Sequence, residues 1–374
     1  MKKKLVLLGG GHAHVYLLKS LTLIAPQPFD GVEITLISPY ARQVYSGMLP
    51  GWVAGHYDIS QCVIPLAPLA LRADVRFHQT AATKIDFARN VIQCADGQEI
   101  SFNLLSIDTG PVANLSFIPG LAEHAIPIRP IENFIDAYAK LASDIEQRHA
   151  RGERTRVAFV GAGAGGVELA MAMQHRFRDY NVDVTLISAA NTLPGSVGPR
   201  LARLMRARGI VVLAGQAATA IAEGSVQLAS GATVEADVVI AATGAPAAAW
   251  PRESGLLTDK DGFILVNDKL QSISHPNVFA AGDCATIEHH ARPRSGVYAV
   301  KAGPPLNENL RRALRGAALQ RYVPQARSLY LISAGDKYAI GSWGSFAWEG
   351  GWVWRWKDFI DRGFVEKYSV VVSE

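Results

Sequence analysis

The chain has 374 residues, of which 49% are hydrophobic and 19% charged, so it is long enough for two or three domains with separate cores. Its formal net charge is +4 and the basic residues are spread along the sequence, which argues against a nucleic-acid-binding protein. Cys62, Cys94 and Cys284 share no C-x-x-C spacing. Neither a redox dithiol nor a metal site is therefore expected.

The N-terminus and the hydrophobic segments indicate where the protein acts. After Met1 to Lys4 only four apolar residues precede the first glycine, which is too few for a secretory signal. No segment has the roughly 20 apolar residues of a membrane-spanning helix. A cytoplasmic protein is expected, and its tail, described below, leaves attachment to the inner membrane face open.

A glycine-rich turn follows the first apolar run of the chain. Leu5 to Leu8 predict a buried strand, and Gly9-Gly10-Gly11-His12-Ala13-His14 come directly after it. Such a turn places a helix N-terminus, with its unpaired amides and positive dipole end, against a pyrophosphate. Gly31 to Ser38 then predict the second strand of a βαβ unit.

The residues after Ser38 change character. Pro39 to Tyr57 are rich in proline, glycine and tyrosine, which predicts a long loop of the kind that contacts ligands. Alternating segments after this loop predict antiparallel strands, followed by a strand that ends at a Thr-Gly pair: Val75 to Phe77, Lys84 to Phe87, Val91 to Cys94, and Leu104 to Asp108 before Thr109-Gly110.

The second half repeats this order. Ile131 to Arg151 predict a helix that leads to the strand Val157 to Val160 and the turn Gly161-Ala162-Gly163-Ala164-Gly165-Gly166. Asn181 to Ser188 repeat the pattern of the earlier second strand. The later strands repeat as well: Val211 to Leu213, Val226 to Leu228, and Val238 to Ala242 before Thr243-Gly244. Two nucleotide-binding folds are predicted.

The last third of the chain contains a strand, a helix and an unusual tail. Val278 to Asp283 predict a short strand that ends in Gly-Asp. A helix is predicted to begin near Gly303-Pro304-Pro305, because the first helical turn tolerates prolines. Five of the seven tryptophans then fall between Trp343 and Trp356, among glycines and basic residues.

This ordered set of motifs resembles the pyridine nucleotide-disulfide oxidoreductase superfamily. The resemblance implies an α/β fold with two Rossmann-like three-layer domains, one for FAD and one for NAD(P)H, and a small C-terminal α+β cap. The implied domains are the first part of the FAD-binding domain (1–115), the NAD(P)H-binding domain (116–255), the second part of the FAD-binding domain (256–325) and the cap (326–374).

Because the chain has no redox dithiol, it resembles two narrower groups within this superfamily. These are the type II NADH dehydrogenases and, in local motifs, the flavoprotein module that is fused upstream of selenophosphate synthase. The second likeness rests on Gly9 to His14, on Tyr45-Ser46-Gly47-Met48-Leu49-Pro50-Gly51, and on Trp354 to Arg362. The sequence contains no synthase domain, so a stand-alone version is expected.

The resemblance also implies a set of cofactor contacts. On the FAD side they are Gly9, Gly11, His12, His14, Ser38, Arg42, Tyr45, Ser46, Met48, Thr109, Gly110, Gly282, Asp283, Lys301 and Gly303. On the nicotinamide side they are Gly161, Gly163, Gly166, Ser188, Thr243 and Gly244.

Two departures from the superfamily pattern matter. His14 occupies the third glycine position, so either the first helix lies further from the sheet or His14 turns toward the ligand. Ser38 and Ser188 stand where an acidic residue usually binds ribose hydroxyls. The choice between NADH and NADPH therefore stays open. A metal bound by both His12 and His14 is not expected, because residues two apart at a helix start face different directions.

Two residues are candidates for catalysis in a flavoprotein that passes hydride from nicotinamide to flavin. By resemblance, Glu168 faces both rings; alternatively it is a carboxylate that favours a helix N-terminus. Lys301 and the helix start near Gly303 would stabilise the anionic edge of a reduced flavin. The alternative for Lys301 is an exposed lysine before a helix.

The composition of the tail suggests where an electron acceptor could bind. Interleaved tryptophans and cations suit a membrane interface or a quinone site, and they equally suit a cap that buries its tryptophans against the FAD domain or a twin subunit. The expected function is FAD-dependent oxidation of NAD(P)H with a small acceptor, quinone first. The alternative is an electron-transfer partner of a selenium or sulfur metabolism enzyme. Sulfide oxidation would need Cys62 or Cys94 to meet Cys284.

Overall fold

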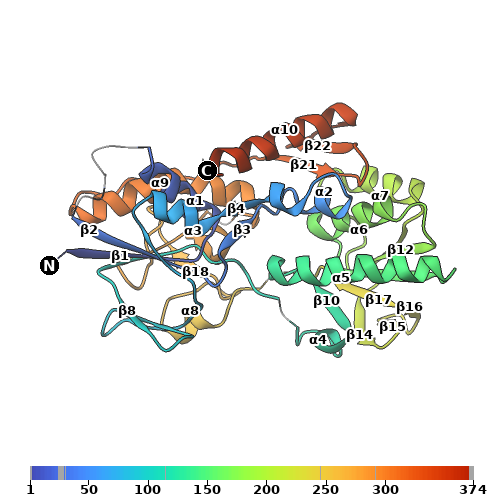
Figure 1. The fold of residues 1–374 in the computed structure, drawn as a ribbon, viewed down its shortest axis with the longest axis horizontal. Helices are drawn as coiled ribbons and strands as arrows, with labels where there is room; N and C mark the ends of the chain where they lie inside the picture. The colour runs from blue at the N-terminus through green and yellow to red at the C-terminus, as the bar shows by residue number, and fades with distance from the viewer. Residues whose placement is uncertain are drawn as a thin grey trace.

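The computed structural model describes residues 2–23, 29, 31–113, 115–244, 246–290 and 292–369. Two α/β bodies lie side by side, and a smaller C-terminal unit extends over both of them (Figure 1). The N-terminal strand lies in one body, while the long green helix α5 (Ile131–Ala150) lies in the other. This arrangement confirms the predicted α/β class with two nucleotide-binding folds and a cap.

The first body is built on a five-stranded parallel sheet in the order β19-β9-β1-β2-β5. Its strands are β1 (Lys3–Leu8), β2 (Val32–Ile37), β5 (Arg76–His78), β9 (Leu104–Ile107) and β19 (Val278–Ala280). The strands are nearly continuous apolar runs because helices cover both faces of a parallel sheet. The covering helices include α1 (His12–Leu21), α3 (Leu66–Arg72) and α9 (Gly296–Leu314), and α1 packs along α9.

The second body repeats this arrangement with the sheet order β10-β17-β11-β12-β13. Its strands are β10 (Ala125–Pro127), β11 (Thr155–Val160), β12 (Val182–Ser188), β13 (Val211–Ala214) and β17 (Val238–Ala241), and its helices include α5, α6 (Ala164–Arg176) and α7 (Gly198–Ala207). In each sheet the strand before the glycine turn lies in the centre. The predicted internal repeat is thus confirmed at the level of strand order.

Each body also carries a small antiparallel sheet. The first contains β6 (Ala82–Asp86), β7 (Val91–Cys94) and β8 (Glu99–Ser101), and the second contains β14 (Ala218–Ala222), β15 (Ser225–Leu228) and β16 (Thr233–Glu235). Two strand pairs complete the first body: β3 (Arg42–Val44) with β4 (Val63–Pro65), and β18 (Ile264–Val266) with β20 (Ala285–Ile287). Short helices are α2 (Leu49–Val53), α4 (Leu121–His124), α8 (Trp250–Glu253), η1 (Ile59–Cys62) and η2 (Gly282–Cys284).

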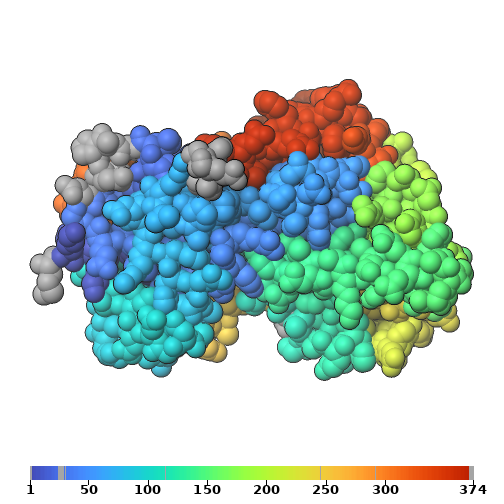
Figure 2. Space-filling view, viewed as in Figure 1, coloured from blue at the N-terminus to red at the C-terminus, as the bar shows by residue number. Residues whose placement is uncertain are grey.

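The C-terminal cap consists of an antiparallel hairpin sheet and one helix. Its elements are β21 (Leu329–Ser333), β22 (Ala339–Trp343), β23 (Phe346–Gly350) and α10 (Gly351–Tyr368). Strand β21 packs on α6 of the second body, whereas α10 contacts α1, β4 and η1 of the first. Figure 2 shows this red segment lying over the blue and green-yellow parts of the chain. The cap therefore connects both nucleotide-binding bodies.

Three local predictions were wrong. The segment Val75 to Phe77 was expected to be antiparallel, but β5 pairs parallel to β2 as the edge of the main sheet. Pro39 to Tyr57 is not one long loop, because it contains β3 and α2. The late helix begins at Gly296 rather than near Gly303.

The proline pair led to the wrong start for α9. Pro304 and Pro305 lie inside α9 rather than in its first turn. Gly303 has a packing role there, since a Cβ at this position would come 2.8 Å from the Tyr16 Cβ on α1. Gly303 is thus a close-approach residue between helices and does not form the helix start that was predicted to face the flavin. Among the described residues, no helix is both long and apolar enough to cross a membrane.

Candidate dinucleotide sites and the cap interface

Both glycine turns have the same backbone geometry. Gly9 has a φ of +96° and donates its amide to the Ile37 carbonyl at 2.8 Å, while Gly161 has a φ of +109° and donates to Ile187 at 2.9 Å. A Cβ at Gly9 would lie 2.5 Å from the Asp108 carbonyl oxygen. The same test at Gly161 gives 2.4 Å to the Ala242 carbonyl oxygen. Only glycine fits either position.

In the first turn, a carboxylate lies beneath the helix N-terminus. Asp108 Oδ2 accepts hydrogen bonds from the backbone amides of Ala13 (2.7 Å) and His14 (3.0 Å). A Cβ at Gly11 would come within 2.3 Å of this carboxylate, and so would one at Gly282. Burial, with a smaller contribution from Asp283, raises the pKa of Asp108 to about 7, although the two amides act in the opposite direction.

His14 does not turn toward a ligand. The side chain is fully buried, with Nδ1 2.6 Å from the Gly9 carbonyl and Nε2 2.7 Å from Ser106 Oγ. Burial lowers the pKa of His14 to about 4, so the ring is neutral. His14 was predicted to be a cofactor contact, and the structure corrects this: both ring nitrogens and its amide already have protein partners.

His12, two residues earlier, has the opposite arrangement. Gln43 Nε2 lies 3.0 Å from His12 Nδ1, while His12 Nε2 and Gln43 Oε1 are buried atoms without a hydrogen-bond partner in the described part of the chain. Burial, and secondarily Arg129, lowers the pKa of His12 to about 4. The neutral ring therefore offers an Nε2–H donor beside a free amide acceptor. A buried polar atom that stays unpaired costs about 1–3 kcal/mol, and a bound polar ligand would remove this cost.

The Gly-Asp motif faces the same region. Asp283 borders a cavity with about 520 Å³ of empty space, together with Gly282, Arg294, Ser295 and Tyr298. Burial raises the pKa of Asp283, while Arg129 and Arg294 lower it. The first turn, the partnerless atoms of His12 and Gln43, and this aspartate together fit a bound FAD.

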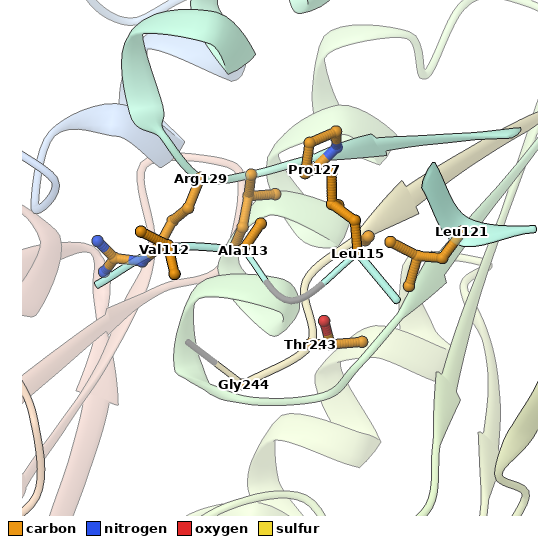
Figure 3. A pocket seen from close by; sticks show the side chains of 10 residues that line it. Val112, Ala113, Leu115, Leu121, Pro127, Arg129, Thr243 and Gly244 are labelled. Carbon is orange, nitrogen blue, oxygen red and sulfur yellow. The ribbon is translucent and has the colours of Figure 1, made fainter. Parts of the chain in front are cut away.

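The second turn has free space at Gly163, whereas the Asp108 carboxylate blocks the equivalent position, Gly11, in the first turn. A Cβ at Gly163 would meet no atom within 4 Å, whereas one at Gly166 would lie 2.2 Å from the Gly161 carbonyl oxygen. Thr243 and Gly244 line a small neighbouring pocket with Val112 and Arg129 (Figure 3). In that view the Arg129 side chain extends away from Leu121 and past Val112. Arg129 lies between β10 and α5 of the second body, and its charge acts on His12 and Asp283 of the first site.

Neither serine at the strand ends offers its hydroxyl proton to a ribose. Ser38 Oγ donates to the Tyr40 carbonyl at 3.1 Å, and Ser188 Oγ donates to the Ala190 carbonyl at 3.0 Å. Both side chains are buried. The predicted ribose contacts of Ser38 and Ser188 are therefore not supported, because each hydroxyl instead closes the same local turn.

The predicted contacts from the segment after β2 separate into two groups. Met48 was predicted to contact the flavin, but its side chain is buried in the hydrophobic core and does not reach the site. Tyr45 is half-buried, and its ring stacks on Phe364 of α10 with centroids 4.6 Å apart. The His12 ring lies 5.8 Å from Tyr45. Arg42 and Ser46 are also half-buried, on β3 and in the turn before α2.

A buried polar network lies between the cap and the two bodies. Lys357 Nζ donates to Asp361 Oδ2 at 2.6 Å and to the Gly47 carbonyl at 2.7 Å. Tyr45 donates its hydroxyl to Asp361 Oδ1 at 3.1 Å. Glu168, in the second turn of α6, accepts from the Ser333 amide at 2.8 Å. Tyr45 comes from the first body, Glu168 from the second, and Lys357 with Asp361 from α10.

The charges in this network influence one another. Burial raises the pKa of Glu168 to about 7, although Lys357 and the Ser333 amide lower it. Burial acts to lower the pKa of Lys357, but Asp361 and Glu168 outweigh it, so the pKa is raised. Burial also raises the pKa of Tyr45, and Asp361 adds to the effect. Glu168 can thus exchange a proton near neutral pH beside a lysine that stays charged.

Lys301 was predicted to stabilise the anionic edge of a reduced flavin. It is an exposed residue in the second turn of α9. The N-terminus of α9 lies at Gly296, and a Cβ there would be 3.9 Å from the His12 ring. The dipole end of α9 therefore faces the first site through Gly296, and a role of Lys301 at the flavin stays a prediction.

The three cysteines are described, and all are buried without a disulfide. Burial raises the pKa of Cys62 and of Cys284 to about 12, so both thiols are poor nucleophiles at neutral pH. Cys284 donates to the Ala281 carbonyl at 3.1 Å. These observations give no support to a cysteine-dependent oxidation of sulfide.

Four residues of the site were not found from the sequence. Asp108 could have been noticed as a charge before the first Thr-Gly pair, where the second half has Ala242. Lys357 and Asp361 have the i, i+4 spacing of an ordinary exposed ion pair, so only the fold shows that they are buried. Arg129 lies between β10 and α5, in a segment without any motif.

The sequence pattern of the pyridine nucleotide-disulphide oxidoreductase family matches residues 3–303 of the chain, which include both turns and the Gly-Asp motif. The chain belongs to this family. It is an FAD-dependent NAD(P)H oxidoreductase, as the paired sites indicate.

Relatives place the chain among flavin-dependent dehydrogenases. It is 26% identical to the NADH dehydrogenase-like protein YutJ of Bacillus subtilis over 91% of this chain and 92% of that protein. It is also 26% identical to the demethylphylloquinone reductase NdbB of Synechocystis, over 76% and 72% of the two chains. The names of these relatives do not mention selenophosphate synthase, so the narrower likeness to that module stays a prediction.

Solved structures confirm the fold over nearly the whole length. The sulfide:quinone oxidoreductase of Aquifex aeolicus superposes with a TM-score of 0.81 at 20% identity, covering 99% of this chain and 93% of that one. NDH2 of Plasmodium falciparum, solved with NADH, gives 0.77 at 15% identity, with 98% of each chain covered. At these identities the likeness concerns the fold, including the cap.

Proposed function

We propose that the chain oxidises NAD(P)H and reduces a quinone at a membrane surface. The observation that carries the proposal is the buried network of Tyr45, Glu168, Lys357 and Asp361, which joins both nucleotide-binding bodies to the cap. The printed names of relatives agree with a quinone acceptor, since NdbB is a demethylphylloquinone reductase. NADH and NADPH both remain candidates for the reductant.

Quinone reduction needs protons as well as electrons. NAD(P)H supplies a hydride, FAD when bound would supply the two-electron relay, and the conversion of quinone to quinol also takes up one proton from the medium. A side chain with a pKa near 7 that is shielded from bulk water suits this proton delivery. Glu168 is half-buried and has its pKa raised to about 7, and we assign it the role of proton donor on the acceptor side.

Lys357 and Asp361 would keep Glu168 ready for this role. The Lys357 ammonium lowers the pKa of Glu168 and stabilises the carboxylate that remains after proton donation. Asp361 holds Lys357 in place and accepts the Tyr45 hydroxyl. We therefore assign Lys357 and Asp361 as positioning residues rather than as groups that touch the acceptor.

The surface of α10 supports a membrane location. This helix buries charged Lys357 and Asp361 and exposes a stripe of apolar residues at helical spacing. The exposed apolar residues of the cap are Trp343, Phe346, Trp352, Trp356, Phe359 and Ile360. Arg355 and Lys367 are exposed on the same helix. Exposed aromatic residues combined with cations suit the interface of an anionic bilayer, where an apolar quinone is dissolved.

Flavin reduction tests the first half of the proposal. We expect anaerobic addition of NADH or NADPH to bleach the visible absorbance of the flavin, with one coenzyme faster than the other. Subsequent addition of a soluble quinone should restore the absorbance. Bleaching without reoxidation by quinone would contradict the acceptor, and the absence of bleaching would contradict the proposed use of both nucleotide sites in turnover.

Membrane binding tests the second half. The double variant Trp352→Ser/Phe359→Ser should lose co-flotation with vesicles that contain anionic lipid, while its turnover with a soluble quinone stays at the wild-type level. Phe117→Ser is the matched control, because Phe117 is 59% exposed but lies just before α4, in the second body. Equal flotation of the double variant and the wild type would exclude this face as the membrane contact.

A further inference from the structure

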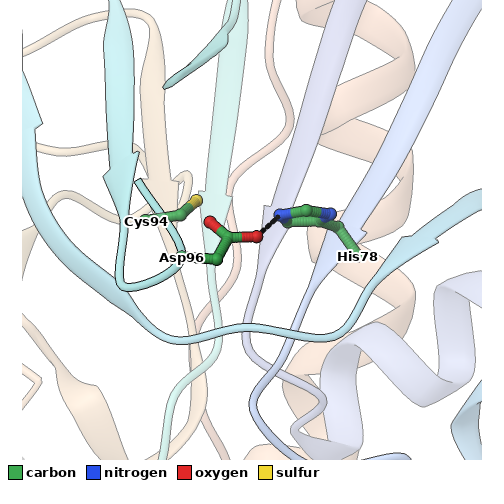
Figure 4. Close-up of side chains that lie close together, drawn as sticks. All are labelled: His78, Cys94 and Asp96. Carbon is green, nitrogen blue, oxygen red and sulfur yellow. Dashed lines mark ion pairs between the residues drawn. The ribbon is translucent and has the colours of Figure 1, made fainter. Parts of the chain in front are cut away.

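A cluster of three potential metal ligands lies outside the sites described so far. His78 ends the edge strand β5, Cys94 ends β7, and Asp96 lies in the turn between β7 and β8. Among the described residues this is the group in which one imidazole nitrogen, one sulfur and one carboxylate oxygen all lie within 4.8 Å of one another. Figure 4 shows the three side chains pointing toward one another from the two sheets.

His78 and Asp96 form an ion pair that lacks the geometry of a hydrogen bond (Figure 4). His78 Nε2 is 3.0 Å from Asp96 Oδ2, yet this buried nitrogen has no hydrogen-bond partner. The two atoms are therefore close without the N–H direction that a hydrogen bond requires. Two ligand atoms that are close but not aligned with each other are what a shared ion between them would produce.

The backbone around the cluster holds the ligands in place. The Gln98 amide donates to Asp96 Oδ1 at 3.1 Å, which fixes the carboxylate and leaves Oδ2 directed at His78. The Cys94 amide donates to the Gln98 carbonyl at 2.9 Å and closes the turn. Gly97 has a φ of +82°, as this tight turn requires. Such outer contacts orient metal ligands and tune their affinity.

The burial and the donor types of the three side chains indicate which ion the cluster would bind. Cys94 is buried, whereas the His78 and Asp96 side chains are 19% and 38% exposed, so the cluster opens to solvent on one side. Nitrogen, sulfur and oxygen donors suit Zn²⁺, which takes four ligands, whereas Mg²⁺ and Ca²⁺ take oxygen donors. Three protein ligands would leave the fourth position to water.

We propose that His78, Cys94 and Asp96 form a Zn²⁺ site that connects the edge of the FAD-domain sheet to its small antiparallel sheet. Such a site would join β5 to the β7–β8 turn and keep one open position. Burial and the Asp96 carboxylate raise the pKa of the Cys94 thiol. Ion binding would have to displace that proton, with release to the medium.

The test uses the FAD-loaded protein after treatment with a chelator. Titration with Co²⁺ should give one equivalent per chain and the intense visible bands of a tetrahedral site at wavelengths beyond the oxidised flavin. Zn²⁺ should displace Co²⁺ and should raise the melting temperature by mass action. X-ray absorption at the zinc edge should show one sulfur neighbour.

Substitutions show whether these particular side chains hold the ion. Cys94→Ser and His78→Gln should each weaken Zn²⁺ binding at least about tenfold, since loss of even an outer partner costs about that much. Cys62→Ser and His124→Gln are the matched controls and should bind like the wild type. Binding that is equal in all four variants would overturn the proposal. It would also be overturned if Cys94→Ser and His78→Gln lost flavin while the wild type bound no ion, because the cluster would then serve the cofactor.

Discussion

The two glycine turns share one backbone and differ in what supports it. Beneath the first turn lie Asp108 and His14, both buried and hydrogen-bonded to the turn or to the helix that follows it. The corresponding positions in the second turn are Ala242 and Gly166, which have no polar side-chain atoms. The first turn is therefore stabilised before any ligand binds, while the second has free space at Gly163. This difference matches a prosthetic group that stays bound and a cosubstrate that exchanges.

The largest effect should come from adding one methyl group to each turn. Gly11→Ala would place a Cβ 2.3 Å from the pinned Asp108 carboxylate, so we expect loss of flavin and of about 1–3 kcal/mol in unfolding free energy. Gly163→Ala meets nothing and should fold and bind flavin normally. It should affect only the apparent KM for NAD(P)H. Flavin content measures cofactor binding, and stopped-flow reduction measures the effect on NAD(P)H. Equal behaviour of the two variants would contradict the proposed difference between the turns.

The next effect concerns the residue at the third glycine position. His14→Ala would leave Ser106 Oγ and the Gly9 carbonyl without their partner in a fully buried place. We expect a loss of about 1–3 kcal/mol in unfolding free energy, measured by denaturant titration of the flavin-free protein. Lys19→Ala is the control, because Lys19 is half-buried in the last turn of α1. A neutral His14→Ala would mean that the ring only fills space.

A pH-dependent effect should arise at Asp108, where the second turn has Ala242. The folded pKa of Asp108, about 7, exceeds the ordinary value of 3.8, so the folded protein holds the proton that the unfolded chain has released. This contribution to stability is complete below about pH 4 and is lost as the pH rises to about 7. Asp108→Asn keeps an acceptor but cannot ionise. Its stability relative to the wild type should therefore increase from pH 5 to pH 8 in flavin-free protein, and a constant difference would refute the shift.

The smallest effect should come from the paired serines. Ser38→Ala and Ser188→Ala each remove one hydrogen bond to a carbonyl two residues ahead. Each should cost about 1 kcal/mol and should leave the preference between NADH and NADPH unchanged. A change of coenzyme preference in Ser188→Ala would show that its hydroxyl binds ribose after all.

The sequence predicted the parts of this molecule that repeat. Glycine turns, apolar strands and Thr-Gly pairs have local signatures, because each turn needs glycine and each parallel strand is buried on both faces. The prolines of α9 led to a wrong prediction of its start. Prolines have a low propensity for helix interiors, but α9 tolerates Pro304 and Pro305 because it is held by packing against α1 and other parts of the fold.

The candidate site was less accessible to sequence analysis. Asp361 and Lys357 are buried only because α10 packs against the turn that contains Tyr45 and Gly47, more than 300 residues earlier. No local pattern encodes such a contact. His78 and Asp96 likewise meet only because a small antiparallel sheet folds back on the edge of the main sheet.

The position of α10 has a consequence for synthesis of the protein. Both nucleotide-binding bodies are complete before the ribosome reaches Gly351, yet Lys357 and Asp361 come from the final helix. A chain interrupted near residue 350 would retain two nucleotide cradles while lacking the charges that control Glu168. The ion pair of Lys357 with Asp361 and the Tyr45–Asp361 hydrogen bond can therefore form only once α10 has been made.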